Sequence, residues 1–374
     1  MLLTASLSLL SLFTSAGLAL NGVGSPAAVV HVAFAVGILP LILAAMIHFV
    51  PVLTRTGDAE RYIRAIPYGA QLFGLVVPLS MLGLLPYHSL LATAAVDIVF
   101  SAILLAWFRR RAKATLGSPH PGWRWYAAAL ACLIAALCAV FVLILWPAGW
   151  RTWRLFHLHL NTLGLVGLAA FGTLPVLLPT ALGRPDPDAG AWLKRRLWLL
   201  GCGALLVAFG SAWWWPLSVA GGSILFVGIF SLIGQWWRRN GLATLLGDGV
   251  SASLLAAVVG YLLALAAGAV HAAGLFSANT AVLAWGIGFL LPLVTGALSQ
   301  LLPVWRWPGP QTSARHLMRQ RLAATGQWRA GLALLAVVCL LAGEFTAAAW
   351  MAASMLALFA IGVVQAVRVE ASTR

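Results

Sequence analysis

Two histidines and an asparagine, His157, His159 and Asn161, stand near the start of the apolar stretch LFHLHLNTLGLVGLAAFGTLPVLLPT, residues 155–180. Neutral imidazole is a good ligand for copper and for haem iron, so these residues could hold a redox metal. His157 and His159 are two residues apart, about 200° around a regular helix, so one metal cannot easily take both. Asn161 follows His157 by four residues, on the same side, and is a candidate hydrogen-bond partner for it.

A repeated proline pattern relates this stretch to two others. LPLILAAMIHFVPV (39–52) and LPLVTGALSQLLPV (291–304) are identical at six of fourteen positions, including both prolines. The last prolines of the three stretches, Pro51, Pro179 and Pro303, are 128 and 124 residues apart. Each interval holds four predicted helices, which indicates three four-helix pseudo-repeats at about 1–110, 111–240 and 241–374.

The repeat places histidines at matching depths. Twenty residues before the three prolines stand His31, His159 and Leu283, so two of the three repeats carry an imidazole at this level. We therefore predict His31 and His159 as metal ligands and His31, His157 and His159 as cofactor-binding residues. The alternative is that each histidine bonds only a carbonyl group or a water molecule near the membrane surface. The sequence leaves open whether His157 or His159 faces the interior.

The elements that must position these residues are membrane-spanning helices. Of the 374 residues, 62% are hydrophobic and only 8% are charged, so a water-soluble fold would lack the polar residues to cover its surface. We predict an all-α polytopic membrane protein whose residues 1–374 form a single integral membrane domain. About twelve apolar segments are long enough to span a core of about 30 Å: 2–20, 27–53, 67–86, 89–108, 124–146, 155–180, 195–213, 217–236, 249–270, 280–304, 328–343 and 346–367.

The distribution of basic residues predicts the topology. The net charge of +15 could suggest a nucleic-acid partner, but all 23 lysines and arginines except Arg151 and Arg154 fall after even-numbered segments. By the positive-inside rule, both termini and the even loops are cytoplasmic, and no nucleic-acid partner is expected. The basic residues after the tenth segment, for example, are Arg306, Arg315, Arg319, Arg321 and Arg329.

Asp97, in TAAVDIVF, is the one carboxylate well inside a predicted span. An acid in the membrane is costly, so Asp97 is a candidate proton relay, although it could equally bond a neighbouring helix. The chain has no phosphate-binding loop, dinucleotide fingerprint, nucleophile elbow or H-E-x-x-H motif. ATP-driven or hydrolytic chemistry is therefore not expected.

Twelve helices in three four-helix repeats, with histidines toward the outer side of the second and sixth, resemble subunit I of the haem-copper oxidase superfamily. HLHLNTLGLVGLAAFGTLPVLLPT is most similar to the branch of cbb3-type oxidases and nitric oxide reductases. The resemblance implies haem b and copper as cofactors. His31 matches the second-helix histidine that holds low-spin haem, and His157 or His159 lies on the helix that supplies a copper ligand.

The chain departs from that family at its tenth and seventh helices. LAWGIGFLLPLVTGALSQLLP (283–303) lacks the family's H-x-H pair, and LWLLGCGALLVAFGSAWWW (197–215) lacks its copper-ligand histidines. A complete oxygen-reducing centre is therefore not expected. What remains could be one haem between His31 and a histidine of the sixth helix, or a copper site on the outer side.

Three functions follow from these observations. The first is a haem- or copper-binding protein of a bacterial cytoplasmic (inner) membrane that serves electron transfer, metal handling or a nitrogen-oxide response, with the lipid bilayer and an electron-donor or respiratory-chain protein as partners. The second is a cofactor-free membrane transporter, suggested by mid-helix prolines such as Pro40, Pro175 and Pro292. The third is an accessory or assembly subunit of a respiratory complex.

Overall fold

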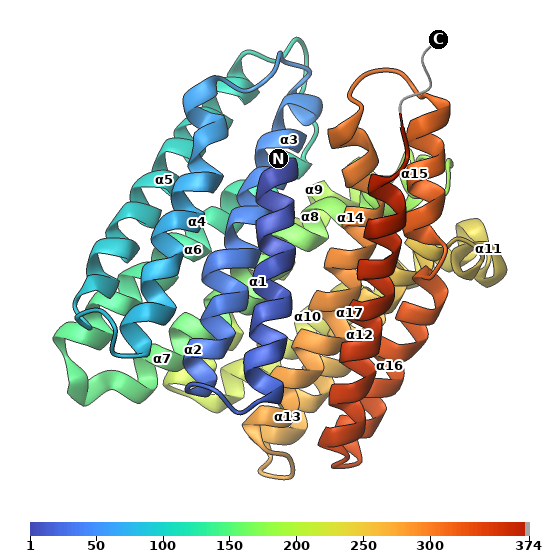
Figure 1. The fold of residues 1–374 in the computed structure, drawn as a ribbon. Coiled ribbons are helices and arrows are strands. Elements are labelled where there is room, and N and C mark those ends of the chain that lie inside the picture. Colours follow the sequence, from blue (N-terminus) through green and yellow to red (C-terminus); the bar gives the residue numbers. More distant parts are fainter. Residues whose placement is uncertain (371–374) are drawn as a thin grey trace. The chain divides into compact units, whose positions relative to one another are not determined.

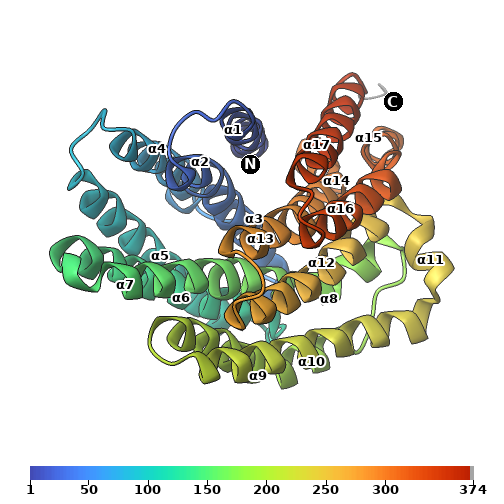
Figure 2. The same ribbon diagram turned by 90° about the horizontal axis from the view of Figure 1, so that it is seen from below.

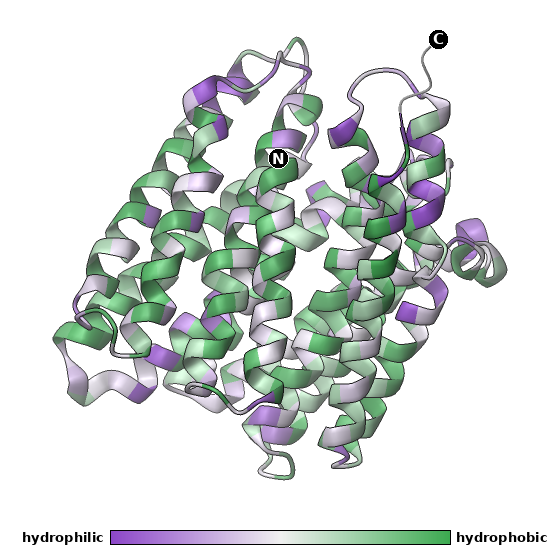
Figure 3. Ribbon diagram, in the orientation of Figure 1, coloured by the Kyte–Doolittle hydropathy of each residue, from purple (hydrophilic) through white to green (hydrophobic). Residues whose placement is uncertain are grey.

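Every regular element of residues 1–370, the part of the chain that the structure describes, is a helix (Figure 1). The structure is a computed structural model. Eleven helical segments are long and apolar enough to cross a membrane, which confirms the predicted all-α polytopic membrane fold. In Figure 3 the apolar colour runs along the middle of the helices, and the hydrophilic colour gathers at ends such as those of α5 (Ser89–Lys113) and α15 (Ser313–Ala323).

Predicted segment 67–86 does not reach the apolarity of the other eleven. It corresponds to helix α4 (Arg61–Met81), which starts six residues before the prediction and ends five before it. Arg64, Gln71 and two prolines lower its mean hydropathy. α4 nevertheless packs along α5 over much of its length, and Figure 1 shows the two side by side.

The chain divides into two compact units. The first contains residues 1–173 and 190–221, and the second contains residues 174–189 and 222–370 of the described chain. The first unit holds α1 (Leu2–Leu20), α4, α5, α6 (Gly122–Leu145), α7 (Trp150–His159), α9 (Ala189–Ala212) and the second predicted span. The second unit holds α12 (Gly249–Ala272), α15, α16 (Gly326–Leu341), α17 (Phe345–Val367) and the tenth predicted span. Helices α8 (Leu168–Ala181) and α10 (Trp215–Asn240) belong partly to each unit.

The three proline-bearing spans share one irregularity: each contains a π-helical segment. These segments are η1 (Val32–Ile38), η3 (Leu160–Gly167) and η4 (Ala284–Leu290), and each begins 19 residues before the repeat proline. In a π segment each hydrogen bond reaches one residue further along the chain than in an α-helix, and such segments are frequent at functional sites. The second span is α2 (Pro26–His31), η1 and α3 (Leu39–Thr54); the sixth is α7, η3 and α8; the tenth is α13 (Ala278–Leu283), η4 and α14 (Leu291–Arg306).

The first and third of these spans also begin alike. The Ser25 hydroxyl accepts a hydrogen bond of 3.2 Å from the Ala28 N–H and caps α2, and Ser277 does the same for Thr280 at 3.2 Å in α13. Both serines stand 26 residues before their repeat proline. Side-chain caps satisfy amide groups that have no partner within the helix. The first and third spans thus share a serine cap, and all three spans share a π segment.

Side chains of neighbouring helices bond the carbonyl groups around Pro40. Proline has no N–H, so the Val36 carbonyl, four residues earlier, loses its regular α-helical donor. The Gln71 side-chain amide on α4 donates to that carbonyl at 3.0 Å. The Ser8 hydroxyl on α1 donates to the carbonyl of Gly37 at 2.8 Å. These bonds hold η1 between α1 and α4 in a region without water.

In the second unit, η4 lies against α12 through two glycines. The backbone of Gly288, including its carbonyl oxygen, occupies the space that a Cβ atom on Gly260 would need. Small residues let membrane helices approach this closely, and close packing is what holds helices together in lipid. α12 also packs against α16, and Figure 2 shows α16 between α12 and α17.

Arg329 stands at the start of the predicted span 328–343. It lies in the first turn of α16 and is 0% exposed. Its guanidinium donates to the Leu322 carbonyl at 2.8 Å and lies 4.9 Å from the centre of the Phe359 ring. Its enclosure by α15 and α17 could not be predicted from the sequence.

The Gly260 contact yields a direct test of the packing. We expect Gly260→Ala to lower the midpoint of thermal unfolding in detergent, because the added methyl group must push η4 away at a cost of about 1–3 kcal/mol. Gly268→Ala is the matched control, since it lies on the same helix and a Cβ atom added there would have no neighbouring atom within 4 Å. Equal melting midpoints for the two variants would contradict the close approach.

Candidate metal site

His31 is the last residue of α2 and directly precedes η1. Its ring nitrogen Nδ1 lies 2.7 Å from the Ala27 carbonyl oxygen, one turn earlier. A carbonyl oxygen can only accept, so Nδ1 carries the hydrogen and a neutral ring keeps a free electron pair on Nε2. That tautomer is the one in which a histidine binds a metal through Nε2.

His157 is held in the same tautomer by a different helix. Its Nδ1 lies 2.9 Å from the carbonyl oxygen of Ala136 on α6. The predicted neighbour Asn161 is present: its side-chain amide donates to the His157 carbonyl at 2.9 Å and lies 3.3 Å from Nε2. The ring is therefore fixed by α6 on one side and by its own helix on the other.

The structure brings His31 together with His157. The centres of the two rings are 6.4 Å apart, and the ring planes differ by 19°. Two imidazoles that held one metal with bonds of about 2 Å would have ring centres about 6 Å apart. The distance between the ring centres of His31 and His157 is close to this value, and the two rings are stacked.

His159 occupies the repeat-equivalent place of His31 but has other neighbours. It is the last residue of α7, directly before η3, and its Nδ1 lies 2.8 Å from the Leu155 carbonyl oxygen one turn earlier. Its Nδ1 also lies 2.9 Å from the Ser211 hydroxyl of α9. Within residues 1–370, no three histidine, cysteine, aspartate or glutamate side chains form a metal-binding cluster. The three predicted histidines thus do not gather in one site.

An aromatic cluster fixes the helix that carries both histidines. Trp153 and Phe156 of α7 pack against Phe209 and Trp213 at the end of α9, with ring centres 5.0 to 5.4 Å apart. Such edge-to-face contacts add stability beyond the area that they bury. This cluster was not predicted, although aromatic residues at 153, 156, 209 and 213 have helical spacing.

Asp97, the predicted proton relay, lies in the middle of α5 and is only 5% exposed. Among the described residues, its Oδ1 atom has no hydrogen-bond partner, and the same is true of Oε1 of Gln71 on α4. Contacts between Thr93 and Phe73 and between Phe100 and Gly69 place Asp97 and Gln71 at the same level of α4 and α5. Oδ1 of Asp97 and Oε1 of Gln71 therefore lie at the same depth, and each can accept a hydrogen bond from an additional donor.

No known protein-family model matches the chain, and no curated protein matches it. The resemblance to haem-copper oxidases therefore stays a prediction. The candidate site is supported by the positions and hydrogen bonds of its own residues.

The buried carboxylate of Asp97, whose Oδ1 atom has no hydrogen-bond partner, can be tested by its effect on stability. We expect Asp97→Asn to raise the midpoint of thermal unfolding at pH 8, because a buried charge without a partner costs more than a neutral amide of the same shape, by about 1–3 kcal/mol. Asp58→Asn, in an exposed loop, is the control and should leave the midpoint unchanged. A lower midpoint for Asp97→Asn would mean that a cationic partner stabilises the carboxylate.

Proposed function

We propose that this integral membrane protein binds one transition metal, as haem iron or as copper, between His31 and His157. The observation that carries the proposal is the facing of the two rings at 6.4 Å, with each Nδ1 tied to a carbonyl group. The Nε2 electron pair of His31 is then available to a metal, and on His157 a metal would displace the Asn161 amide that lies 3.3 Å from Nε2. When bound, the metal supplies one-electron chemistry, while the protein fixes its ligands.

The donor set favours haem iron or copper over zinc. Structural zinc is held by four protein ligands and catalytic zinc by three, whereas the described residues offer two imidazoles at this place. His31 and His157 would hold haem iron through their imidazoles, because histidine is a common protein ligand of haem. Imidazole is also a good ligand for copper. Two opposed histidines therefore suit either cofactor.

We infer a role in electron transfer, metal handling or a nitrogen-oxide response rather than complete oxygen reduction. The resemblance to haem-copper oxidase subunit I supports this role, and Leu283 stands at the position in the tenth span where His31 and His159 stand in the other two. The missing histidines of the tenth and seventh spans argue against an oxygen-reducing centre. An electron-donor or respiratory-chain protein is the partner that such a site requires.

The proposed location is a bacterial cytoplasmic membrane, with both termini on the cytoplasmic side. The alternation of basic residues along the sequence supports this orientation, which places the histidine pair toward the outer surface. Asp97 is proposed to relay protons within the first unit. Its buried, unpartnered oxygen supports that role, because a carboxyl group in such a place can take up and release a proton.

The test is a reduced-minus-oxidised absorption spectrum with iron and copper analysis on the purified full-length protein. The wild type, expressed with haem and copper supplied, should carry one of the two metals. We expect His31→Ala and His157→Ala each to abolish metal binding, because each variant keeps only one of the two proposed imidazole ligands.

His159→Ala is the matched control, because it removes an imidazole from the same helix two residues away. It should keep the metal. Loss of the metal in His159→Ala with retention in His157→Ala would contradict the proposed pair, and a wild type without iron or copper would contradict the function itself.

A further inference from the structure

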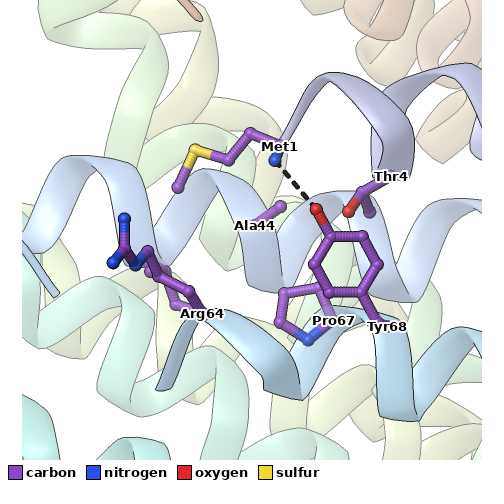
Figure 4. Close-up of a pocket in the computed structure, with 7 residues that line it drawn as sticks. Met1, Thr4, Ala44, Arg64, Pro67 and Tyr68 are labelled. Carbon is purple, nitrogen blue, oxygen red and sulfur yellow. Dashed lines mark hydrogen bonds between the residues drawn. The ribbon is translucent and has the colours of Figure 1, made fainter. Parts of the chain in front are cut away.

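A cavity of about 270 Å³ opens in the first unit between α1, α3 and α4 (Figure 4). Its polar lining comes from Arg64 and Tyr68, one turn apart on α4, and from Thr4 and the amino group of Met1. Its apolar wall comes from Ala44, Ile47 and Pro67. The cavity thus combines a cation and a hydroxyl group with an apolar floor.

Arg64 has no acidic partner among the described residues, since none of the ion pairs of residues 1–370 includes it. The acid nearest to it along the chain, Glu60, is already bound to Arg111 at 3.0 Å and to the Trp107 ring N–H at 2.8 Å. Tyr68 accepts a hydrogen bond of 3.2 Å from the Met1 nitrogen, which Figure 4 shows as a dashed line, and its hydroxyl hydrogen can be donated elsewhere. The cavity therefore offers positive charge and a donor to an anion.

An apolar strip continues from the cavity along the same face of α4. Leu72, Leu75 and Leu79 follow Tyr68 at helical spacing and are 65%, 45% and 37% exposed. Leu79 follows Tyr68 by eleven residues, a rise of about 16 Å along the helix, which is about half of a 30 Å hydrocarbon core. The strip is therefore as long as one leaflet of a bilayer is deep.

We propose that this cavity binds the phosphate headgroup of an anionic phospholipid, with an acyl chain along Leu72, Leu75 and Leu79. Arg64 pairs with the phosphate, and the Tyr68 hydroxyl donates to one of its oxygens. The cavity lies at the end of the bundle that carries Arg55, Arg61 and the basic end of α5. Basic pockets between membrane helices are typical headgroup sites in the leaflet on that side.

The inference is tested by native mass spectrometry of the full-length protein in detergent, titrated separately with phosphatidylglycerol, phosphatidylcholine and inorganic phosphate. Phosphatidylglycerol should be retained and phosphatidylcholine lost at matched concentration. Arg64→Gln should weaken phosphatidylglycerol binding about tenfold, the loss expected for one charge-assisted bond. Tyr68→Phe should weaken it less, because it removes a single neutral donor.

Arg61→Gln is the matched control, since it removes an exposed arginine from the same first turn that does not line the cavity. It should bind phosphatidylglycerol like the wild type, and all variants should show the same size-exclusion profile. Equal retention of the two lipids, or equal loss in Arg61→Gln and Arg64→Gln, would overturn the proposal. Binding of inorganic phosphate without retention of lipid would overturn the lipid assignment.

Discussion

The need to satisfy backbone hydrogen bonds without water is the constraint on which the rest of this structure depends. Inside a bilayer, a carbonyl group that loses its helical donor must find another within the protein. The chain places prolines inside its spans, and Pro40 shows the consequence: Gln71 of α4 and Ser8 of α1 bond carbonyl groups of η1. The irregular span thereby fixes the positions of its neighbours.

Two of the histidines lie at the boundary between an α-helix and a π segment. His31 is the last residue before η1, and His159 is the last residue before η3. The Nδ1 atom of each ring bonds a carbonyl oxygen one turn earlier in the same helix. Their local geometry is therefore set by the repeat. His157 lies outside the repeat pattern, and the Ala136 carbonyl of a different helix orients it toward His31. The two histidines therefore share one tautomer, although only His31 occupies a position that the repeat duplicates.

Much of the fold could be predicted from the sequence, since hydropathy and length identified eleven of the spans. The threefold repeat stays a prediction from the spacing of Pro51, Pro179 and Pro303. The π segments could not be predicted from proline alone, because η3 is followed by Leu168 and Ala169 where the other two are followed by a leucine and then Pro40 or Pro292. They depend on packing against neighbouring helices.

The sequence predicted which histidines could form the site, but it did not predict that His157 rather than His159 lies beside His31. Helical spacing shows that His157 and His159 point to different sides, yet it does not say which side faces His31. That choice depends on where α6 and α9 lie, which is a property of tertiary packing. The burial of Arg329 depends on packing in the same way, because its charge was visible in the sequence and its enclosure was not.

The most direct test of the central claim is hyperfine spectroscopy of the oxidised, metal-loaded protein with nitrogen-15 histidine. We expect two coordinated imidazole nitrogens on one metal, with the metal signal lost in His157→Ala and two nitrogens kept in His159→Ala. A single coordinated imidazole in the wild type, or an unchanged spectrum in His157→Ala, would contradict a metal held between His31 and His157.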